Sequence, residues 1–362
     1  MSIVKLTTNN FRNLENTTID FNPDFNFFIG KNGSGKSSLL ESLFFLGHGK
    51  SFRTAKVENI TNFDHKNFVV SVCDNNNKRF GLLKDTLAGT TDIKINGVRH
   101  TKFSELAQNI AVQIITPESF KLFFGGPKER RRFVDLGMFH VKHQFSEQWK
   151  IFTQIHKQRN ACLKNNVTGQ QFDYWTQQFC ESCENIASLR NEYLTELKSE
   201  LSVWLEILLP QFQHDISVSY LQGWNSKKAL LDILALNAER ELEKGHSLFG
   251  AQRFDVRFQY KGLAIENLLS RGQQKLFLLA LTFAQAKLIE QVKRVKPILL
   301  IDDIGAELDE NSRAAFYQSI KAVNCQVFIT AIDQQALEPI IPKDNNYYMF
   351  HVEHGRISAI SK

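Results

Sequence analysis

An eight-residue segment near the N-terminus constrains the fold more than any other part of the chain. Residues 30–37 have the sequence Gly-Lys-Asn-Gly-Ser-Gly-Lys-Ser, which matches the pattern G-x-x-x-x-G-K-[ST] at every fixed position. The apolar run Phe25–Ile29 before it is typical of a buried strand, and Ser37–Leu46 after it is typical of a helix. A strand, a glycine-rich loop and a helix in this order predict a phosphate-binding loop in an α/β fold.

The chemistry of such a loop gives each residue a role. Its glycines let backbone N–H groups turn inward around phosphate oxygens, and the N-terminus of the helix adds partial positive charge. Lys36 would reach the β- and γ-phosphates of ATP, and the Ser37 hydroxyl would ligate Mg²⁺. The alternative is a glycine-rich turn without a ligand, which the flanking strand and helix disfavour. The predicted ATP-binding residues of the loop are Gly30, Lys31, Asn32, Gly33, Ser34, Gly35, Lys36 and Ser37.

A second motif lies near the C-terminus. Four apolar residues, Ile298–Ile301, are followed by Asp302 and Asp303. A strand buried in a parallel sheet brings such acids to the carboxyl edge of the sheet, where ligands bind. Asp302 is the predicted second Mg²⁺ ligand, and Asp302, Asp303 and Lys36 are the predicted catalytic residues. The alternative is a buried strand that simply ends in two surface acids.

The segment Leu269-Ser270-Arg271-Gly272-Gln273 resembles the L-S-G-G-Q signature of ABC-type ATPases, with Arg271 in place of the first glycine. It directly precedes a predicted helix, Gln273–Gln291, whose N-terminus offers a second phosphate-binding surface. In that superfamily the signature completes the nucleotide site of the opposing subunit. The resemblance therefore implies two ATP molecules held between the chains of an ATP-dependent, head-to-tail homodimer. An ordinary N-capped helix is the alternative. The predicted contacts to the partner's ATP are Ser270, Arg271, Gly272 and Gln273.

Two positions depart from the superfamily pattern. The residue after the first aspartate of the strand is usually Glu, and here it is the shorter Asp303. The predicted strand Val327–Ala331 carries Thr330 where a histidine is usual, while 307–309 (Glu-Leu-Asp) resembles the D-loop. A shorter base and a missing histidine both weaken activation of the attacking water. They predict slow ATP hydrolysis, which suits a switch better than a motor.

The spacing of the motifs distinguishes branches of the superfamily. Lys36 and Ser270 are 234 residues apart, and helical patterns dominate from 127 to 210 with one break at 165–169. Transporter subunits have only a small helical insertion there, and SMC proteins have a long coiled coil that this chain lacks. A short arm, with the segments Asn10–Leu14 and Gly125–Asp135, is similar to the bacterial RecF family. One segment departs, because 250–255 (Gly-Ala-Gln-Arg-Phe-Asp) replaces the usual G-P-H-R-D-D.

This resemblance covers essentially the whole chain and implies its organisation. The implied fold is an α/β, ABC-type (SMC-like) P-loop ATPase head with an inserted all-helical arm domain. We expect the N-terminal part of the head at 1–116, the arm at 117–212, and the C-terminal part of the head at 213–362. The implied cofactors are ATP and Mg²⁺, and Arg12 and Asn13 would lie near the nucleotide.

Charge is distributed unevenly along the chain. The whole chain carries +6, but the window 121–164 has ten Lys and Arg residues against three acids and so carries +7. Such a window is typical of a polyanion partner, although a solvated helix face is the alternative. The family resemblance implies DNA, both double-stranded and at gapped or single-stranded junctions, together with RecR and RecO proteins in loading a recombinase. It also implies a weak DNA-dependent ATPase. The candidate DNA contacts, which could alternatively brace the arm against the head, are Arg130, Arg131 and Arg132.

Other function classes find less support. No apolar run is long enough to cross a bilayer, and the first residues lack the apolar stretch of a secretory signal, so we expect a cytoplasmic protein. Cys180 and Cys183 form a C-x-x-C pair within a helical pattern, which predicts core packing rather than zinc binding. A transporter ATPase subunit is the main alternative function, but it predicts a switch histidine and a short insertion. A P-loop nucleotide or sugar kinase would not explain the signature segment.

Overall fold

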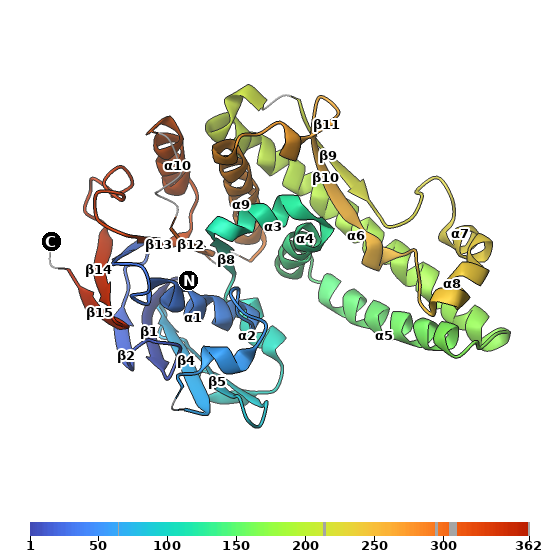
Figure 1. Cartoon of the computed structure of the whole chain (residues 1–362), viewed down its shortest axis with the longest axis horizontal. Coiled ribbons are helices and arrows are strands. Elements are labelled where there is room, and N and C mark those ends of the chain that lie inside the picture. The colour runs from blue at the N-terminus through green and yellow to red at the C-terminus, as the bar shows by residue number, and fades with distance from the viewer. Residues whose placement is uncertain (64, 213–214, 294–295, 304–309, 361–362) are drawn as a thin grey trace. The chain divides into compact units, whose positions relative to one another are not determined.

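The computed structural model describes residues 1–63, 65–212, 215–293, 296–303 and 310–360 of the 362-residue chain. The chain forms two compact units (Figure 1). The first consists of Met1–Phe120 together with Arg271–Lys362, and the second consists of Lys121–Ser270. None of the described helices is long and apolar enough to span a membrane.

The first unit contains a six-stranded sheet in the order β15-β14-β3-β13-β12-β8. Five of these strands are parallel, and only β15 runs antiparallel to its neighbour. The carboxyl ends of β3 and β12 therefore lie at the same edge of the sheet. This arrangement brings the glycine-rich loop and the aspartate pair to one place. The strands are β3 (Phe25–Ile29), β8 (Val112–Ile115), β12 (Ile298–Ile301), β13 (Gln326–Ala331), β14 (Tyr347–Glu353) and β15 (Arg356–Ala359).

A second six-stranded sheet in this unit is antiparallel, in the order β2-β1-β4-β5-β6-β7. Along β4, every second side chain is buried, as expected for a sheet with one face against a core. The turn between β6 and β7 is an Asn-Gly pair, whose residues Asn96 and Gly97 both have the positive φ angles that such a tight hairpin requires. The strands are β1 (Ile3–Asn9), β2 (Thr17–Asp20), β4 (Asn67–Asp74), β5 (Arg79–Asp85), β6 (Thr91–Ile95) and β7 (Val98–His100).

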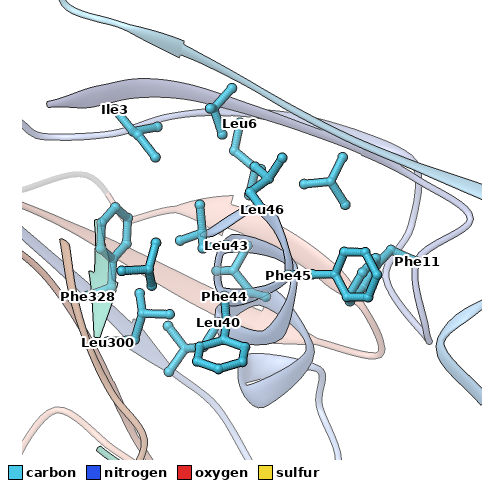
Figure 2. Packing of buried hydrophobic residues seen from close by; sticks show 14 of the residues in the cluster. Ile3, Leu6, Phe11, Leu40, Leu43, Phe44, Phe45, Leu46, Leu300 and Phe328 are labelled. Atoms are coloured by element: carbon cyan, nitrogen blue, oxygen red, sulfur yellow. The ribbon is translucent and has the colours of Figure 1, made fainter. Parts of the chain in front are cut away.

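Helix α1 (Lys36–His48) supplies much of the core of the first unit. Figure 2 shows its side chains, among them Leu43 and Leu46, beside Ile3 of β1 and near Leu300 and Phe328 of the parallel sheet. Nearly every residue of α1 is buried, because both sheets contribute to this cluster. Each such side chain contributes about 1.5–3 kcal/mol by leaving water. The core therefore fixes the helix that follows the glycine-rich loop.

The remaining helices include one long, mostly buried helix and several short ones. Helix α9 (Arg271–Lys293) is mostly buried, and its Gln285 accepts a 3.0 Å hydrogen bond from Gln113 of β8. It begins two residues before the predicted start at Gln273. The other helices are η1 (Val57–Ile60), α2 (Phe103–Asn109), η4 (Ile265–Asn267, at the end of the second unit) and α10 (Glu310–Ala322).

The second unit is built on two long helices, α5 (Phe145–Lys164) and α6 (Gln170–Leu208), which pack side by side. The chain leaves one helix and enters the other at the predicted break. Helix α3 (Pro117–Gly125) contains the point in the sequence where the first unit ends and the second begins. The other elements of the second unit are α4 (Pro127–Val141), η2 (Pro210–Phe212), β9 (Ile216–Leu221), α7 (Leu230–Leu236), α8 (Ala238–Lys244), η3 (Ala251–Arg253), β10 (Asp255–Tyr260) and β11 (Leu263–Ala264).

The compact unit differs in extent from the predicted arm. We expected an all-helical arm that ends at 212, but the unit continues to Ser270 and contains a three-stranded sheet. The physical reason is that β9 and β10 pair with each other, and Arg190 of α6 binds the segment between them. Its guanidinium donates to the Ala251 carbonyl at 2.6 Å and lies 3.5 Å from the centre of the Phe254 ring.

Buried polar groups also hold the second unit together. The Arg159 side chain of α5 is 1% exposed and donates to Glu241 of α8 at 2.7 Å, to Ser247 at 2.6 Å and to Thr176 at 3.2 Å. Cys180 and Cys183 are buried along α6, as predicted for a core-facing pair. Burial raises the pKa of Cys180 to about 11 and that of Cys183 to about 12. Within the described ranges, no cluster of His, Cys, Asp and Glu side chains could hold a metal ion.

Candidate nucleotide-binding site

The glycine-rich loop lies between β3 and α1 and is held against the turn that follows β14. A Cβ atom added to Gly30 would lie 2.2 Å from the Val352 carbonyl oxygen, so only glycine allows this approach. The Gly355 amide donates to the Ser34 carbonyl at 2.7 Å, and the Gly355 carbonyl accepts from Glu15 at 3.0 Å. An added Cβ at Gly355 would lie only 1.8 Å from the Asn13 carbonyl oxygen. Backbone contacts therefore set the shape of the loop.

Lys36 is buried at the first position of α1, with 7% of its surface exposed. Its ammonium group donates to the carbonyl oxygens of Gly30 at 2.5 Å and Lys31 at 3.0 Å, so it closes the loop. Burial lowers the pKa of Lys36 below its ordinary value, and the charges of Asp303 and Asp302 oppose that shift without cancelling it. The result is a positive group at the loop, beside two carboxylates.

Asp302 connects the loop to the parallel sheet. One oxygen of its carboxylate, Oδ1, accepts from the Ser37 hydroxyl at 3.0 Å and from the Thr330 hydroxyl at 2.7 Å. The Thr330 oxygen also accepts from the Asp303 amide at 3.0 Å. Thr330, at the expected histidine position, thus fixes the carboxylate of Asp302 and the backbone of Asp303. Asp303 itself has a φ of 50°, a conformation that non-glycine residues rarely adopt.

Ser37 and Asp302 fit a magnesium ion chemically. Both offer hard oxygen ligands, and the two oxygens already lie 3.0 Å apart. Mg²⁺ is usually held by one or two such protein groups together with substrate phosphates, which matches a pair of ligands beside a phosphate-binding loop.

Arg12 and Asn13 lie beside the loop, as the resemblance implies. The Arg12 guanidinium donates two hydrogen bonds to the Glu41 carboxylate of α1, at 2.9 and 2.7 Å, and one to the Asn59 carbonyl at 2.5 Å. Glu41 is fully buried, so this pair is a strong constraint on the position of Arg12. The side-chain oxygen of Asn13, Oδ1, accepts a hydrogen bond from the Ser38 hydroxyl at 2.8 Å.

These elements enclose a pocket of about 780 Å³ at the carboxyl edge of the parallel sheet. The loop side and the acid side of the pocket come from segments more than 260 residues apart in the sequence. Such a volume is large enough for a nucleotide. The structure brings together most of the predicted ATP-binding and catalytic residues as lining residues: Arg12, Asn13, Asn32, Gly33, Ser34, Gly35, Lys36, Ser37, Asp302 and Asp303.

Comparison with known proteins assigns the family. The RecF/RecN/SMC N-terminal domain model matches residues 2–358. The chain belongs to this family. It is 58% identical over 371 residues to the DNA replication and repair protein RecF of Colwellia psychrerythraea, covering 100% of this chain and 98% of that protein. It is 40% identical over 365 residues to RecF of Pseudoalteromonas translucida, covering 99% of each.

Solved structures agree on the fold. A structure described as the recombination mediator protein RecF with ATP in the RecFOR pathway matches with a TM-score of 0.86 at 24% identity, covering 99% of this chain and 98% of that chain. An Smc head bound to the C-terminal winged-helix domain of ScpA matches with a TM-score of 0.57 at 18% identity, covering 100% and 98%. These matches confirm the predicted SMC-like, ABC-type ATPase head. None of them favours the transporter ATPase.

Some predicted RecF-family residues lie outside the lining of the pocket. Gly30 and Lys31 contribute carbonyl groups to Lys36 instead of lining the pocket. Signature residues 271–273 belong to the first unit, but they do not line the pocket of their own chain. Ser270 directly precedes α9 and is exposed, and a Cβ added to Gly272 would meet nothing within 4 Å. The D-loop-like segment 307–309 lies outside the described residues.

The three arginines of the predicted cluster make different contacts within the second unit. Arg130 donates two hydrogen bonds to the Asp255 carboxylate, at 3.0 and 2.9 Å, and Arg131 donates to the Phe254 carbonyl at 3.1 Å. These contacts give both residues a structural role within the second unit, rather than a contact to the first. Arg132 is more exposed and pairs with Glu129 one helical turn away, at 2.8 Å. Arg132 is therefore the member of the cluster that faces solvent.

Several pocket residues were not predicted from the sequence. Besides Pro117 and Ser38, they come from the segment 53–63, which has no family motif and whose short helix and isolated bridge give no signal of ligand binding. Gly355 and Glu41 were also missed, although the His-Gly pair between two strand-like runs could have indicated a tight turn. The lining residues in this segment are Arg53, Glu58, Asn59, Thr61, Asn62 and Phe63.

Proposed function

We propose that this protein is an ATP-gated DNA-binding protein of recombinational repair and replication. The observation that carries the proposal is the pocket that joins Ser37 and Asp302, because it unites a phosphate-binding loop with a carboxylate 265 residues away. The relatives named DNA replication and repair protein RecF support the DNA-related part. In this proposal, ATP closes two chains on DNA and slow hydrolysis separates them again.

The first step is nucleotide binding. Lys36 and the loop amides would bind the phosphates, while Ser37 and Asp302 would hold Mg²⁺. The metal would neutralise negative charge on the β- and γ-phosphates. The structure described with ATP belongs to a protein of the same fold, which supports ATP as the nucleotide. ATP that binds only the closed pair of chains stabilises that pair by mass action.

Dimerisation would use the signature segment. Ser270 is exposed, and the space around Gly272 is open, so this surface is accessible to a phosphate of the partner chain. The fold does not itself require glycine at 272, which supports a role for this residue outside its own chain. Each ATP would then be bound by the loop of one chain and by Ser270, Arg271, Gly272 and Gln273 of the other.

Hydrolysis would be slow and the activity that of a weak, DNA-dependent ATPase. Asp303 is the candidate general base, with a shorter side chain than the usual glutamate. Thr330 is engaged with Asp302 and with the Asp303 backbone, so it orients these groups but offers no imidazole to the γ-phosphate. Slow turnover keeps the closed state populated long enough to act as a switch.

The proposed partners are DNA, RecR and RecO. The basic window 121–164 lies within the second unit, where phosphate contacts would bind duplex or gapped DNA without reading its sequence. The structural neighbour described in the RecFOR pathway supports RecR and RecO as partners that assist recombinase loading on single strands. Such a role would place the protein in the cytoplasm.

Sedimentation velocity tests the proposal with the wild type and the Ser270→Arg variant, with and without ATP and duplex DNA. The wild type should be monomeric without nucleotide and dimeric with Mg²⁺-ATP, and DNA should strengthen the shift. The bulky Ser270→Arg side chain should block dimerisation while leaving ATP binding to the monomer unchanged. A Ser270→Arg protein that still dimerises with ATP would contradict the shared nucleotide site.

A further inference from the structure

The phosphate-binding loop forms only one side of the pocket. If a triphosphate binds along Gly33–Ser37, the base and ribose must occupy the remainder. That remainder is formed largely by the segment 53–63. Phe63 is the only aromatic side chain among the described residues that line the pocket. It is therefore the feature best suited to a flat, apolar ring.

The exposure of Phe63 is unusual. Its side chain is 106% exposed, whereas the next most exposed large hydrophobic residue in the described chain, Leu236, is 76% exposed. Phenylalanine is among the residues most often fully buried. A ring that protrudes into solvent at the edge of a polar pocket thus contributes little to the fold itself. It offers its face to a ligand instead.

The backbone that carries Phe63 is fixed, although its ring is exposed. Thr61 forms a bridge with Phe11, the Arg12 amide donates to the Ile60 carbonyl at 2.7 Å, and the Asn62 amide donates to the Asn10 carbonyl at 2.9 Å. These bonds tie the segment to residues 10–12, which follow β1 and of which Arg12 also lines the pocket. A ring on an anchored backbone loses less conformational entropy when it binds a ligand.

Thr61 provides a second, independent observation. It lines the pocket and is 92% buried, yet its hydroxyl oxygen has no hydrogen-bond partner among the described residues. An unpaired buried hydroxyl is destabilising unless a hydrogen-bond partner arrives. The Ser34 hydroxyl at the loop end of the pocket is unpaired in the same way. Both ends of the pocket therefore contain polar groups that a bound nucleotide could satisfy.

We propose that Phe63 is the base-stacking residue of the nucleotide site. This inference rests on the proposed ATP binding and adds the residue that contacts the base. Stacking of a base on an aromatic side chain contributes about 1–3 kcal/mol and depends little on which base is present. Phe63 therefore raises affinity for nucleotides over inorganic polyphosphate, but it does not itself select adenine over guanine.

Calorimetry with two ligands tests this role on the full chain. Mg²⁺-ATP and Mg²⁺-tripolyphosphate share the phosphate chain, but only ATP has a base. Phe63→Ala should weaken ATP binding about 5- to 150-fold and leave tripolyphosphate binding unchanged. Phe63→Tyr should restore ATP affinity, because it keeps an aromatic face. Leu87→Ala is the matched control, since Leu87 is 72% exposed in the same unit and does not line the pocket.

Fluorescence provides a second measurement. All four tryptophans lie in the second unit, so Phe63→Trp adds the only tryptophan of the first unit. ATP should quench its emission, while tripolyphosphate should not. Three results for Phe63→Ala would each overturn the stacking role. They are an unchanged ATP affinity, an equal loss of affinity for ATP and tripolyphosphate, and a loss of dimerisation with no loss of ATP affinity. If the wild type binds neither ligand, the proposed function fails first and this inference fails with it.

Discussion

At the scale of single residues, the site depends on side chains whose ordinary properties are changed by their neighbours. Lys36 is buried and closes the loop through two carbonyl groups, and Thr330 holds Asp302 in place of the usual histidine. The Lys36 charge is useful for phosphate binding only while the amine is protonated. Because burial lowers its pKa, that charge is lost at a lower pH than for a free lysine.

This shift predicts an alkaline loss of ATP affinity. The contribution of the Lys36 charge should be fully present at neutral pH and should be lost as the pH rises through the lowered pKa, below the ordinary value of 10.5. Above that point, affinity should fall about tenfold per pH unit. Lys36→Arg should bind ATP with little pH dependence, because a guanidinium stays charged throughout. The measurement is the ATP dissociation constant across pH 7 to about 10.

Lys275 requires a control in the same experiment. Burial lowers its pKa also, with Asp303 opposing, so it could titrate in the same range. Lys275→Arg should retain the pH dependence of the wild type if Lys36 is responsible. Should Lys275→Arg abolish that dependence while Lys36→Arg keeps it, the assignment to Lys36 would be wrong.

At the scale of secondary-structure elements, helices position the functional groups and buried ion pairs hold helices together. Helix α1 is fixed by the core of the first unit, and α9 carries the signature residues at its exposed N-terminus. In the second unit, Arg159 links α5 to α8 through Glu241. Removing one partner of such a pair leaves the other as an uncompensated buried charge.

Glu241→Gln should therefore destabilise the second unit by about 3–5 kcal/mol. The amide has nearly the same shape, so the loss reflects the missing charge rather than a cavity. Urea unfolding followed by tryptophan fluorescence reports this unit alone, because all four tryptophans lie within it. Glu239→Gln on the exposed face of the same helix is the control and should change stability by less than about 0.5 kcal/mol. Equal stability of the two variants would mean that the ion pair does not hold α8 in place.

Gly272→Ala separates folding from partner contact at the start of α9. Alanine fits the open space and favours the helix by about 0.5–1 kcal/mol, so thermal stability should be equal or slightly higher. The added methyl group should nevertheless impede a phosphate of the partner chain and reduce ATP-dependent dimerisation, measured by sedimentation. Gly125→Ala, also in open space and within α3, is the control and should leave dimerisation unchanged. Normal dimerisation of Gly272→Ala would argue against a contact there.

At the scale of the whole molecule, two units share the proposed task. The first unit holds the nucleotide pocket, and the second carries the whole basic window. Within that window, the contacts of the arginines distinguish structural from exposed charge. Arg130 is bound to Asp255, while Arg132 faces solvent beside Glu129.

Substitution of these arginines should give different results. Arg132→Ala should weaken DNA binding for all sequences alike and reduce the slope of log affinity against log salt by about 0.9, because one phosphate contact is lost. Arg130→Ala should instead lower the thermal stability of the second unit, because Asp255 loses its partner. Gel shifts with ATP at several salt concentrations, together with melting curves, measure both effects. An unchanged slope for Arg132→Ala would remove it from the DNA interface.

The local features and the family could be predicted from the amino-acid sequence. The glycine-rich loop, the aspartate pair, the Asn-Gly hairpin and the helix break at 165–169 depend on short-range backbone preferences, which neighbouring residues set. Only the tertiary structure revealed that the second unit extends to Ser270, that Thr330 binds Asp302, and that Phe63 lies at the pocket. Those features depend on contacts between residues far apart in the chain. No local pattern encodes such contacts, because they arise only when strands pair and helices pack.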